Sequence, residues 1–212
     1  GSQVVPKDVE SKEIWQSLGV SDVREEGMAD VFWGPTGSDG PCGPTTEIYC
    51  KNSAGQDVEI WNIVFNEFFC DGSREQLLSG KAKLSPLEIK GIDTGMGLER
   101  LAMVSQNVPT VFETDLFDNA KIKEERIVAD HIRAIAFLIS DGVLPSNKNQ
   151  GYILRRLMRR ILIWDLDFNI LFKNVFEKYQ ALYLNLDLKN ITEIFNKEAG
   201  AFSLSLSEGL KF

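Results

Sequence analysis

Polar side chains in two strand-like runs could bind a charged substrate. In the run 59–69, Glu-Ile-Trp-Asn-Ile-Val-Phe-Asn-Glu-Phe-Phe, the two-residue period of a strand puts alternate residues on one face, namely Ile60, Asn62, Val64 and Asn66. A buried amide without a partner costs about 1–3 kcal/mol, so Asn62 must form a hydrogen bond. Asn62 is therefore a candidate ligand contact, and a hydrogen bond to neighbouring backbone is the alternative.

The next strand-like run, 84–92, is followed by a carboxylate and a helix with a basic first turn. Asp93 either binds a cation or is the N-cap of the helix that follows. The two glycines of Gly95-Met-Gly97 would let a ligand approach the backbone closely. Arg100 opposes the helix dipole in the first turn, which indicates either a bound phosphate or a surface ion pair.

The segment 126–162 is basic in an otherwise acidic chain. It contains seven cationic and two acidic residues, a net charge of +5, whereas the whole chain carries −8. Four arginines recur here at spacings of one, three and four, which predicts one broad helix face: Arg155, Arg156, Arg159 and Arg160. Phosphates are natural partners for this cluster, and a solvated basic face is the alternative.

The cysteines and the single histidine match no common metal-binding pattern. Cys42, Cys50 and Cys70 are odd in number and widely spaced, so we expect free, partly buried thiols in a reducing compartment. A zinc site would need all three cysteines and His131, with no close pair among them. His131 is instead interpreted as a histidine satisfied at a helix–helix contact.

Length and composition are those of a globular protein with one large domain or two small ones. The chain has 212 residues, of which 43% are apolar and 25% charged, and this excludes disorder for the bulk of it. No uncharged apolar run approaches the roughly 18 residues that span a bilayer. We therefore expect a cytoplasmic protein without a membrane partner. Gly1 and Ser2, with no initiator Met, suggest a start partway through a longer gene product.

Residue periodicity predicts a sheet followed by helices. Antiparallel strands are predicted at 45–51, 58–69 and 84–92. The glycine- and proline-rich run 34–44 is predicted to have no regular structure. Helices are predicted at 8–18, 97–106, 126–140, 152–166, 170–184 and 191–210. The fold class is thus α+β, with a sheet-based part at 1–118 and an all-helical part at 119–212.

Six runs of the sequence, in this order, resemble a known family. They are Phe32-Trp-Gly34, Gly40-Pro-Cys-Gly-Pro-Thr-Thr-Glu-Ile48, Glu59-Ile-Trp-Asn-Ile-Val-Phe65, Asp93-Thr-Gly-Met-Gly-Leu-Glu-Arg-Leu101, Ala129-Asp-His-Ile-Arg133, and Asp141-Gly-Val-Leu-Pro-Ser-Asn147 continuing to Arg156. Together they resemble alanyl-tRNA synthetase, a class II aminoacyl-tRNA synthetase. The resemblance is strong from about Val31 to Arg160. It implies a partial class II antiparallel sheet with flanking helices, followed by an all-helical tRNA-recognition domain.

For the sheet-based part, this resemblance implies sites for alanine and ATP. The run 95–101 would be the third class II motif, in which Arg100 contacts the ATP γ-phosphate as a catalytic residue and Gly97 belongs to the ATP site. The Asp93 carboxylate would hold the substrate ammonium, a contact worth about 1.5–3 kcal/mol. ATP and Mg²⁺ are the implied cofactors, with no magnesium ligand identified. The alanine pocket would be lined by Trp33, Asn62, Val64, Asp93 and Gly95.

For the helical part, the resemblance implies the tRNA acceptor stem as partner. Asn147 precedes the arginine-rich helix and would read the minor-groove edge of a wobble G·U pair. The guanine 2-amino group offers a donor there to the Asn oxygen. The four arginines of that helix would contact phosphates.

Several parts of the family have no counterpart in this sequence. They include the first two class II motifs, with the arginine that clamps the ATP α-phosphate, and the editing and C-terminal domains. The connection 118–126 and the stretch after Arg160 are also shorter than is usual. We therefore expect part of a ligase that activates alanine with ATP and transfers it to its tRNA, inactive without the remainder of the synthetase. The alternative is a non-catalytic RNA-binding module.

Overall fold

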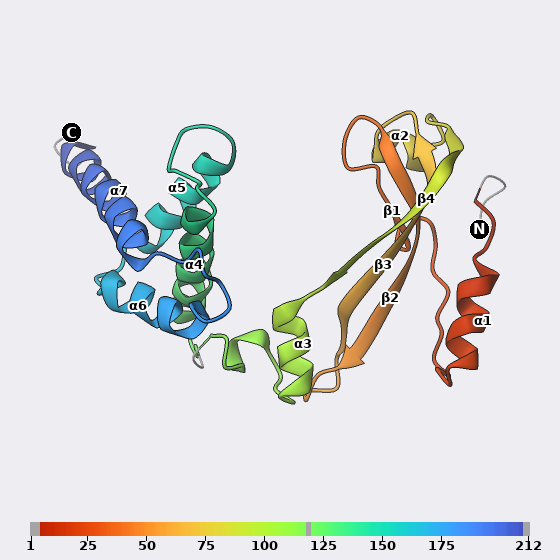
Figure 1. Cartoon of the computed structure of the whole chain (residues 1–212), viewed down its shortest axis with the longest axis horizontal. Coiled ribbons are helices and arrows are strands. Elements are labelled where there is room, and N and C mark those ends of the chain that lie inside the picture. The colour runs from red at the N-terminus through yellow and green to blue at the C-terminus, as the bar shows by residue number, and fades with distance from the viewer. Residues whose placement is uncertain (1–4, 118–119, 210–212) are drawn as a thin grey trace. The chain divides into compact units, whose positions relative to one another are not determined.

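The computed structural model describes residues 5–117 and 120–209. The chain divides into two compact units, residues 1–111 and 112–212 (Figure 1). The first unit holds the sheet and the second is helical, which confirms the predicted α+β order of a sheet followed by helices. The predicted boundary between residues 118 and 119 lies outside the described residues.

The first unit is built on a four-stranded antiparallel sheet with the strand order β1-β2-β3-β4. Its strands are β1 (Phe32–Trp33), β2 (Gly40–Lys51), β3 (Asp57–Cys70) and β4 (Leu84–Met96). The long β3 pairs with β2 on one side and β4 on the other. The helices of this unit are α1 (Val9–Ser17), α2 (Arg74–Leu78) and α3 (Leu98–Ser105).

The glycine- and proline-rich run 34–44 is more regular than its composition predicts. Residues 40–44 begin β2 and pair with both β1 and β3, so the prediction of no regular structure is wrong for the second half of the run. Gly43 lies opposite Trp33 of β1, and a Cβ atom on Gly43 would lie 1.6 Å from the carbonyl oxygen of Phe65. Glycine here permits a close backbone approach rather than breaking the strand.

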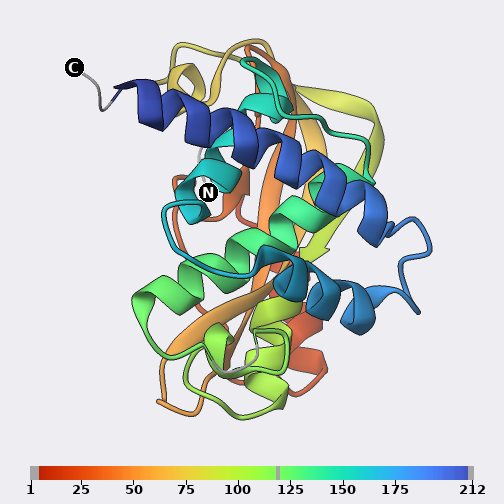
Figure 2. The same ribbon diagram turned by 90° about the vertical axis from the view of Figure 1, so that its left-hand side faces the viewer.

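The second unit consists of the short 3₁₀ helix η1 (Val111–Glu113), which begins one residue before it, and four α-helices. These are α4 (Lys123–Ser140), α5 (Asn149–Ile161), α6 (Phe168–Tyr179) and α7 (Leu188–Gly209). Helix α4 contacts the other three, and α7 also contacts α5 and α6 (Figure 2). All four α-helices were predicted. Apart from the end of α4 at Ser140, their first and last residues differ from the predicted ones, and the predicted end at Leu210 lies outside the described residues. No helix within the described ranges is long and apolar enough to cross a membrane.

The helical unit has a hydrophobic core of its own. Leu154, Met158 and Ile161 are fully buried on α5 at spacings of four and three, the period of one helix face. They belong to the same cluster as Phe172 and Phe195, whose ring centroids lie 4.9 Å apart in an edge-on arrangement. Each fully buried side chain of this size contributes about 1.5–3 kcal/mol. The core therefore fixes which sides of α5 and α7 face each other.

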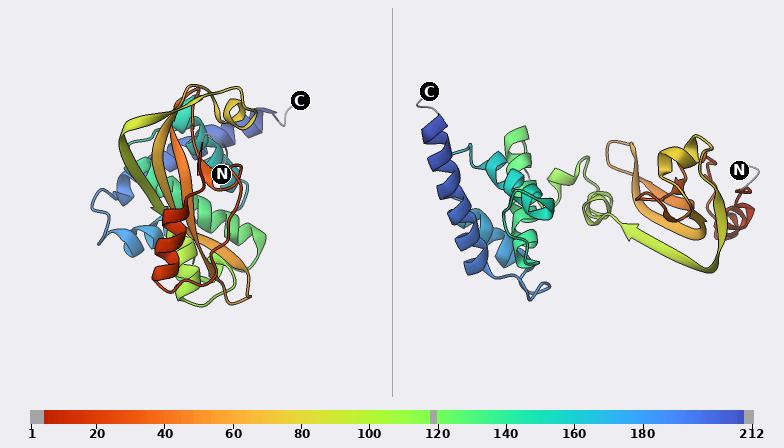
Figure 3. Two further views of the ribbon diagram at one scale, coloured as in Figure 1. Left: turned by 90° about the vertical axis from the view of Figure 1, so that its right-hand side faces the viewer. Right: turned by 90° about the horizontal axis from the view of Figure 1, so that it is seen from above.

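Strand β4 is longer than predicted and forms one edge of the sheet (Figure 3). It continues past Ile92 to Met96, and Gly97 is the N-cap of α3. Asp93 therefore lies within the strand, and the alternative that it caps the helix is wrong. Helix formation begins only after the strand pairing with β3 ends at Met96.

Cysteine reactivity tests the core of the first unit. Cys42 and Cys70 have no exposed surface, whereas Cys50 is half-buried. Burial raises the pKa of the Cys42 thiol to about 11, so little thiolate forms near neutral pH. We expect an aromatic disulfide reagent at about pH 8 to label one thiol quickly and the other two only on unfolding. Cys50→Ser should abolish the fast phase, and a fast phase that survives this change would contradict the burial.

Candidate functional site

The pairing of β3 with β4 gathers four of the predicted alanine-site residues on one face of the sheet. Asn62 lies opposite Gly95, and Val64 lies opposite Asp93. Directly opposed residues of antiparallel strands point to the same side, and so do residues two apart on one strand. Asn62, Val64, Asp93 and Gly95 therefore share this face. Solvent exposure differs along this face: Val64 is buried, whereas Asp93 and Gly95 are exposed.

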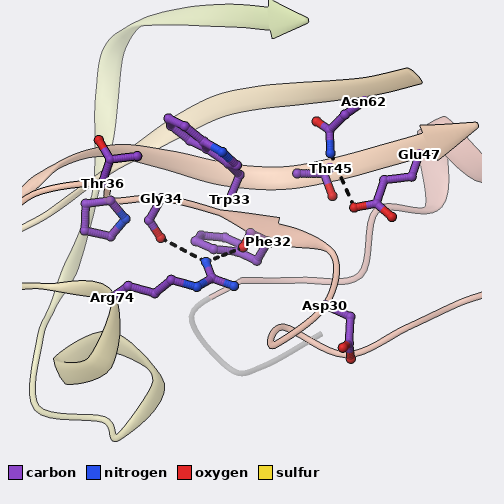
Figure 4. Close-up of a pocket in the computed structure, with 10 residues that line it drawn as sticks. Asp30, Phe32, Trp33, Gly34, Thr36, Thr45, Glu47, Asn62 and Arg74 are labelled. Carbon is purple, nitrogen blue, oxygen red and sulfur yellow. Dashed lines mark hydrogen bonds between the residues drawn. The ribbon is translucent and has the colours of Figure 1, made fainter. Parts of the chain in front are cut away.

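A pocket of about 450 Å³ opens beside this face (Figure 4). It includes two of the predicted residues, Trp33 and Asn62, while Val64, Asp93 and Gly95 are not among its lining residues. The complete lining is Asp30, Phe32, Trp33, Gly34, Pro35, Thr36, Thr45, Glu47, Asn62 and Arg74.

Glu47 holds the Asn62 amide at the pocket. The Asn62 Nδ2 donates to Glu47 Oε1 at 3.3 Å, and the Tyr49 hydroxyl donates to Glu47 Oε2 at 2.8 Å (Figure 4 shows the first of these). The hydrogen bond to Glu47 raises the pKa of Tyr49 to about 12. Asn62 thus has a side-chain partner, not the backbone partner that the sequence left open. Thr45 Oγ1, also in the pocket wall, is buried without a hydrogen-bond partner among the described residues.

Arg74 fixes the backbone on both sides of Trp33. Its Nη1 donates to the carbonyl oxygens of Phe32 at 2.5 Å and Gly34 at 3.2 Å (Figure 4). Its Nη2 donates to the carbonyl oxygen of Ala29 at 3.0 Å. One rigid guanidinium plane thereby orients the pocket wall. Sequence reasoning missed Arg74, because no local pattern relates it to a loop about 40 residues earlier.

Sequence reasoning also missed Thr45 and Glu47, although both lie in the run 40–48. The usable signal was the strand period, since the two residues alternate along β2 and stand opposite Val64 and Asn62.

Asp93 and Gly95 form an open strip on β4. The Asp93 side chain is exposed and has no hydrogen-bond or ion-pair partner among the described residues. A Cβ atom on Gly95 would meet nothing within 4 Å. The strip therefore offers an uncompensated negative charge beside space that no side chain fills.

Arg100 makes the ion pair that the sequence left as one alternative. Its Nη1 donates to the carbonyl oxygen of Glu59 at 2.9 Å and to the Glu59 carboxylate at 3.3 Å. The Arg100 side chain remains 51% exposed. Exposed pairs of this kind contribute only about 0–1 kcal/mol, so Arg100 could exchange Glu59 for a stronger anion at little cost.

The helical unit divides the four predicted arginines into two pairs. Arg155 and Arg159 face the buried carboxylate of Glu198 on α7, whereas Arg156 and Arg160 are exposed. Successive helical residues are rotated by about 100°, so the second pair points away from the first. The expectation of one uniformly available basic face is therefore too simple.

The loop before α5 is held against that helix. Asn147 Oδ1 accepts a hydrogen bond from Arg155 Nη1, and the Ser146 N–H donates to the Gly151 carbonyl oxygen at 3.0 Å. A Cβ atom on Gly151 would lie 2.4 Å from the Leu144 carbonyl oxygen and 2.3 Å from Ser146 Oγ. The absence of a side chain at Gly151 thus allows the loop to lie where it does.

His131 is a packed side chain with one partner. It is 7% exposed, its Nδ1 lies 3.0 Å from Asp130 Oδ2, and its Nε2 is buried without a partner among the described residues. All three cysteines are free. In the described part of the chain, no group of three or more His, Cys, Asp or Glu side chains could hold a metal ion.

A family model described as tRNA synthetases class II (A) matches residues 2–212, and the chain belongs to this family. The individual relatives that the chain matches have a narrower name than the family model. The chain is 36% identical to an alanine-tRNA ligase of Thermotoga maritima, in an alignment covering 98% of this chain and 28% of the relative. An alanine-tRNA ligase of Bacillus subtilis is also 36% identical, with 98% and 27% covered. One of Rubrobacter xylanophilus is 38% identical, with 76% and 22% covered.

These comparisons confirm the resemblance to alanyl-tRNA synthetases. The chain spans about a quarter of the length of the curated relatives it matches. The Thermotoga alignment runs over 253 positions although the chain has 212 residues, so the relative contains segments without a counterpart here.

Two glycine substitutions test how tightly the loop before α5 is packed. Gly151→Ala should destabilise the chain by about 1–3 kcal/mol, because its methyl group would overlap the loop. Gly200→Ala, on α7, is the matched control: its Cβ would meet nothing within 4 Å, and alanine should stabilise the helix by up to about 1 kcal/mol. Urea unfolding followed by circular dichroism measures both. A Gly151→Ala protein as stable as the wild type would contradict the packing.

Proposed function

We propose that this chain forms part of an enzyme that activates alanine with ATP and transfers it to its tRNA. The observation that carries the proposal is the face shared by Asn62, Val64, Asp93 and Gly95 beside the pocket that contains Trp33. An amide, an apolar side chain, a carboxylate and an open glycine suit a small amino acid with a charged ammonium group. The relatives, which are named alanine-tRNA ligases, support alanine as that amino acid.

In this proposal, Asp93 binds the alanine ammonium. Its carboxylate has no partner among the described residues, so a cationic ligand displaces no existing interaction. Charge-assisted hydrogen bonds of this type contribute about 1.5–3 kcal/mol. Asn62, oriented by Glu47, contacts the polar backbone atoms of the substrate, and the buried Val64 limits the space for its side chain. Thr45 Oγ1 would gain a hydrogen-bond partner when the pocket is filled.

ATP would lie along the start of α3, with Arg100 on its γ-phosphate and Gly97 permitting close approach. The exposed pair with Glu59 supports this role, because a phosphate is a stronger partner for the guanidinium. Mg²⁺ is usually held by one or two carboxylates together with substrate phosphates. Glu47, in the pocket wall, is a carboxylate of the kind required, and Mg²⁺ would neutralise charge on the phosphates.

The reaction would proceed by adenylation and then acyl transfer. The alanine carboxylate attacks the ATP α-phosphorus and pyrophosphate leaves; a terminal ribose hydroxyl of the tRNA then attacks the acyl carbon and AMP leaves. The residues of this chain contribute positioning of the two substrates, which is a large part of catalysis in such transfers. The arginine expected at the α-phosphate belongs to a family motif without a counterpart in this sequence.

The helical unit would bind the acceptor stem. Asn147 would read the wobble G·U pair, and the exposed Arg156 and Arg160 would contact phosphates. Neither arginine has an ion-pair partner among the described residues, which leaves both charges available to RNA. A second candidate function is RNA binding without catalysis, and the separate hydrophobic core of the helical unit favours it for the chain by itself.

Alanine activation tests the sheet-based half of the proposal. In the full-length synthetase to which we propose this chain belongs, Asp93→Ala should raise the KM for alanine about 10- to 150-fold, because the ammonium loses its counter-charge. The KM for ATP should stay nearly unchanged. Pyrophosphate exchange measures both. Glu88→Ala removes another exposed carboxylate of the same strand and serves as control; equal effects of the two changes would contradict the role of Asp93.

Binding of acceptor-stem hairpins to this chain tests the helical half. Replacing Arg156 and Arg160 with Ala should weaken binding to G·U and G·C hairpins alike and flatten the salt dependence by roughly one to two units of slope. Asn147→Ala should cost about 1–3 kcal/mol on the G·U hairpin and little on the G·C one. Lys189→Ala, an exposed change elsewhere on α7, is the control. Equal losses on both hairpins for Asn147→Ala would leave it no role in reading the base pair.

A further inference from the structure

A single buried carboxylate organises the arginine-rich helix. Glu198 lies on α7 and is 7% exposed. Its Oε1 accepts one hydrogen bond, from Arg159 Nε at 3.0 Å, and lies 2.9 Å from Arg159 Nη2. The Arg155 Nε lies 3.1 Å from the same oxygen, a charge contact whose N–H is not aligned for a hydrogen bond. A carboxylate this deeply buried requires cationic partners, so both arginines are held on this side of α5.

Arg155 connects the buried carboxylate to the loop before α5. Only 23% of its side chain is exposed. Its Nη1 donates to Asn147 Oδ1, and its Nη2 donates to the Pro145 carbonyl oxygen at 3.4 Å. The guanidinium is planar and its donors point in fixed directions. When Glu198 fixes one edge of this plane, the direction of the opposite edge is fixed as well.

The contact with Arg155 determines which way the Asn147 amide points. The oxygen must face the guanidinium, because a flipped amide would bring its NH₂ group against the donors of Arg155. The amide oxygen keeps a second lone pair, and the NH₂ group faces away from Arg155. Asn147 therefore presents one acceptor and two donors in a fixed arrangement, although it lies in an exposed loop.

We propose that Glu198 and Arg155 are positioning residues for base-pair recognition: Glu198 holds Arg155, and Arg155 orients the Asn147 amide for the G·U pair. This inference rests on the proposed contact of Asn147 with the acceptor stem. It assigns Arg155 a role in sequence discrimination instead of phosphate binding. Arg159 provides the internal comparison, since it shares Glu198 but has no contact with Asn147.

The experiment measures binding of the full 212-residue chain to two hairpins that differ only in a G·U or a G·C pair. Fluorescence anisotropy at one salt concentration gives the ratio of the two affinities. Arg155→Lys keeps a charge for Glu198 but cannot reach Glu198 and Asn147 together, and Glu198→Gln removes the anchor. Each should lower the preference for G·U about fivefold or more, the change expected for one lost base contact.

Two control variants distinguish positioning from general damage. Arg159→Lys should weaken both hairpins alike, if at all, and leave the ratio within about twofold. Glu193→Gln alters an exposed carboxylate on α7, paired with Lys189 at 3.9 Å, and should change neither affinity. Thermal melting monitors the fold of every variant. If Glu198→Gln unfolds the chain, Arg155→Lys carries the test, because it leaves the buried carboxylate paired.

The outcomes separate this inference from the proposed function. If folded Arg155→Lys and Glu198→Gln proteins keep the G·U preference while Asn147→Ala loses it, the positioning role is overturned and the RNA contact stands. If the wild-type chain shows no preference, or Asn147→Ala retains it, both proposals fail. Loss of preference in Arg159→Lys equal to that in Arg155→Lys would also overturn the specific link through Arg155.

Discussion

The antiparallel register of β3 between its two neighbours is the constraint on which the shared face of Asn62, Val64, Asp93 and Gly95 depends. Side chains alternate along a strand, so a slip of one residue between β3 and β4 would move Asp93 to the opposite side of the sheet. The register is held from the other face, where Trp61 Nε1 donates to Thr94 Oγ1 at 2.6 Å. It is held at β2 by the close approach of Gly43 to the backbone of Phe65. The chemistry of this face therefore follows from contacts that no substrate would touch.

Two ion pairs of the chain differ in burial, and the difference determines how easily each arginine could change its partner. Arg100 is half exposed and its pair with Glu59 is weakly stabilising, so an anionic ligand can replace that partner. Arg159 is paired with a carboxylate that is almost fully buried, and removal of one member would leave an uncompensated charge in the interior. The same residue type thus forms an exchangeable surface pair in one unit and a structural pair with a buried carboxylate in the other.

Counting charges along the sequence overestimates the basic surface of the helical unit. The segment 126–162 carries +5, but Glu198, which lies outside that segment, binds two of its arginines. The positive charge left at the surface of the helical unit comes from the remaining exposed cations, among them Arg156 and Arg160. Arg155 and Arg159 contribute geometry instead, because both connect α5 to α7 and Arg155 also holds the loop before α5.

The sequence by itself determined the order of a sheet followed by helices, the α+β class, the family and the shared face of Asn62 and Val64, but neither strand β1 nor helix α2. Each of these follows from residue types, their spacing and their order along the chain, without knowledge of which distant residues meet. The partner of Asn62, the three carbonyl contacts of Arg74 and the division of the four arginines were decided only by the tertiary structure. Periodicity specifies which face of a strand or helix a side chain occupies; it carries no information about which residue of a distant element lies opposite. Strand register and helix packing make that choice, and for this reason the roles of Arg74 and Glu198, and the pairing of Glu47 with Asn62, could be assigned only from the tertiary structure.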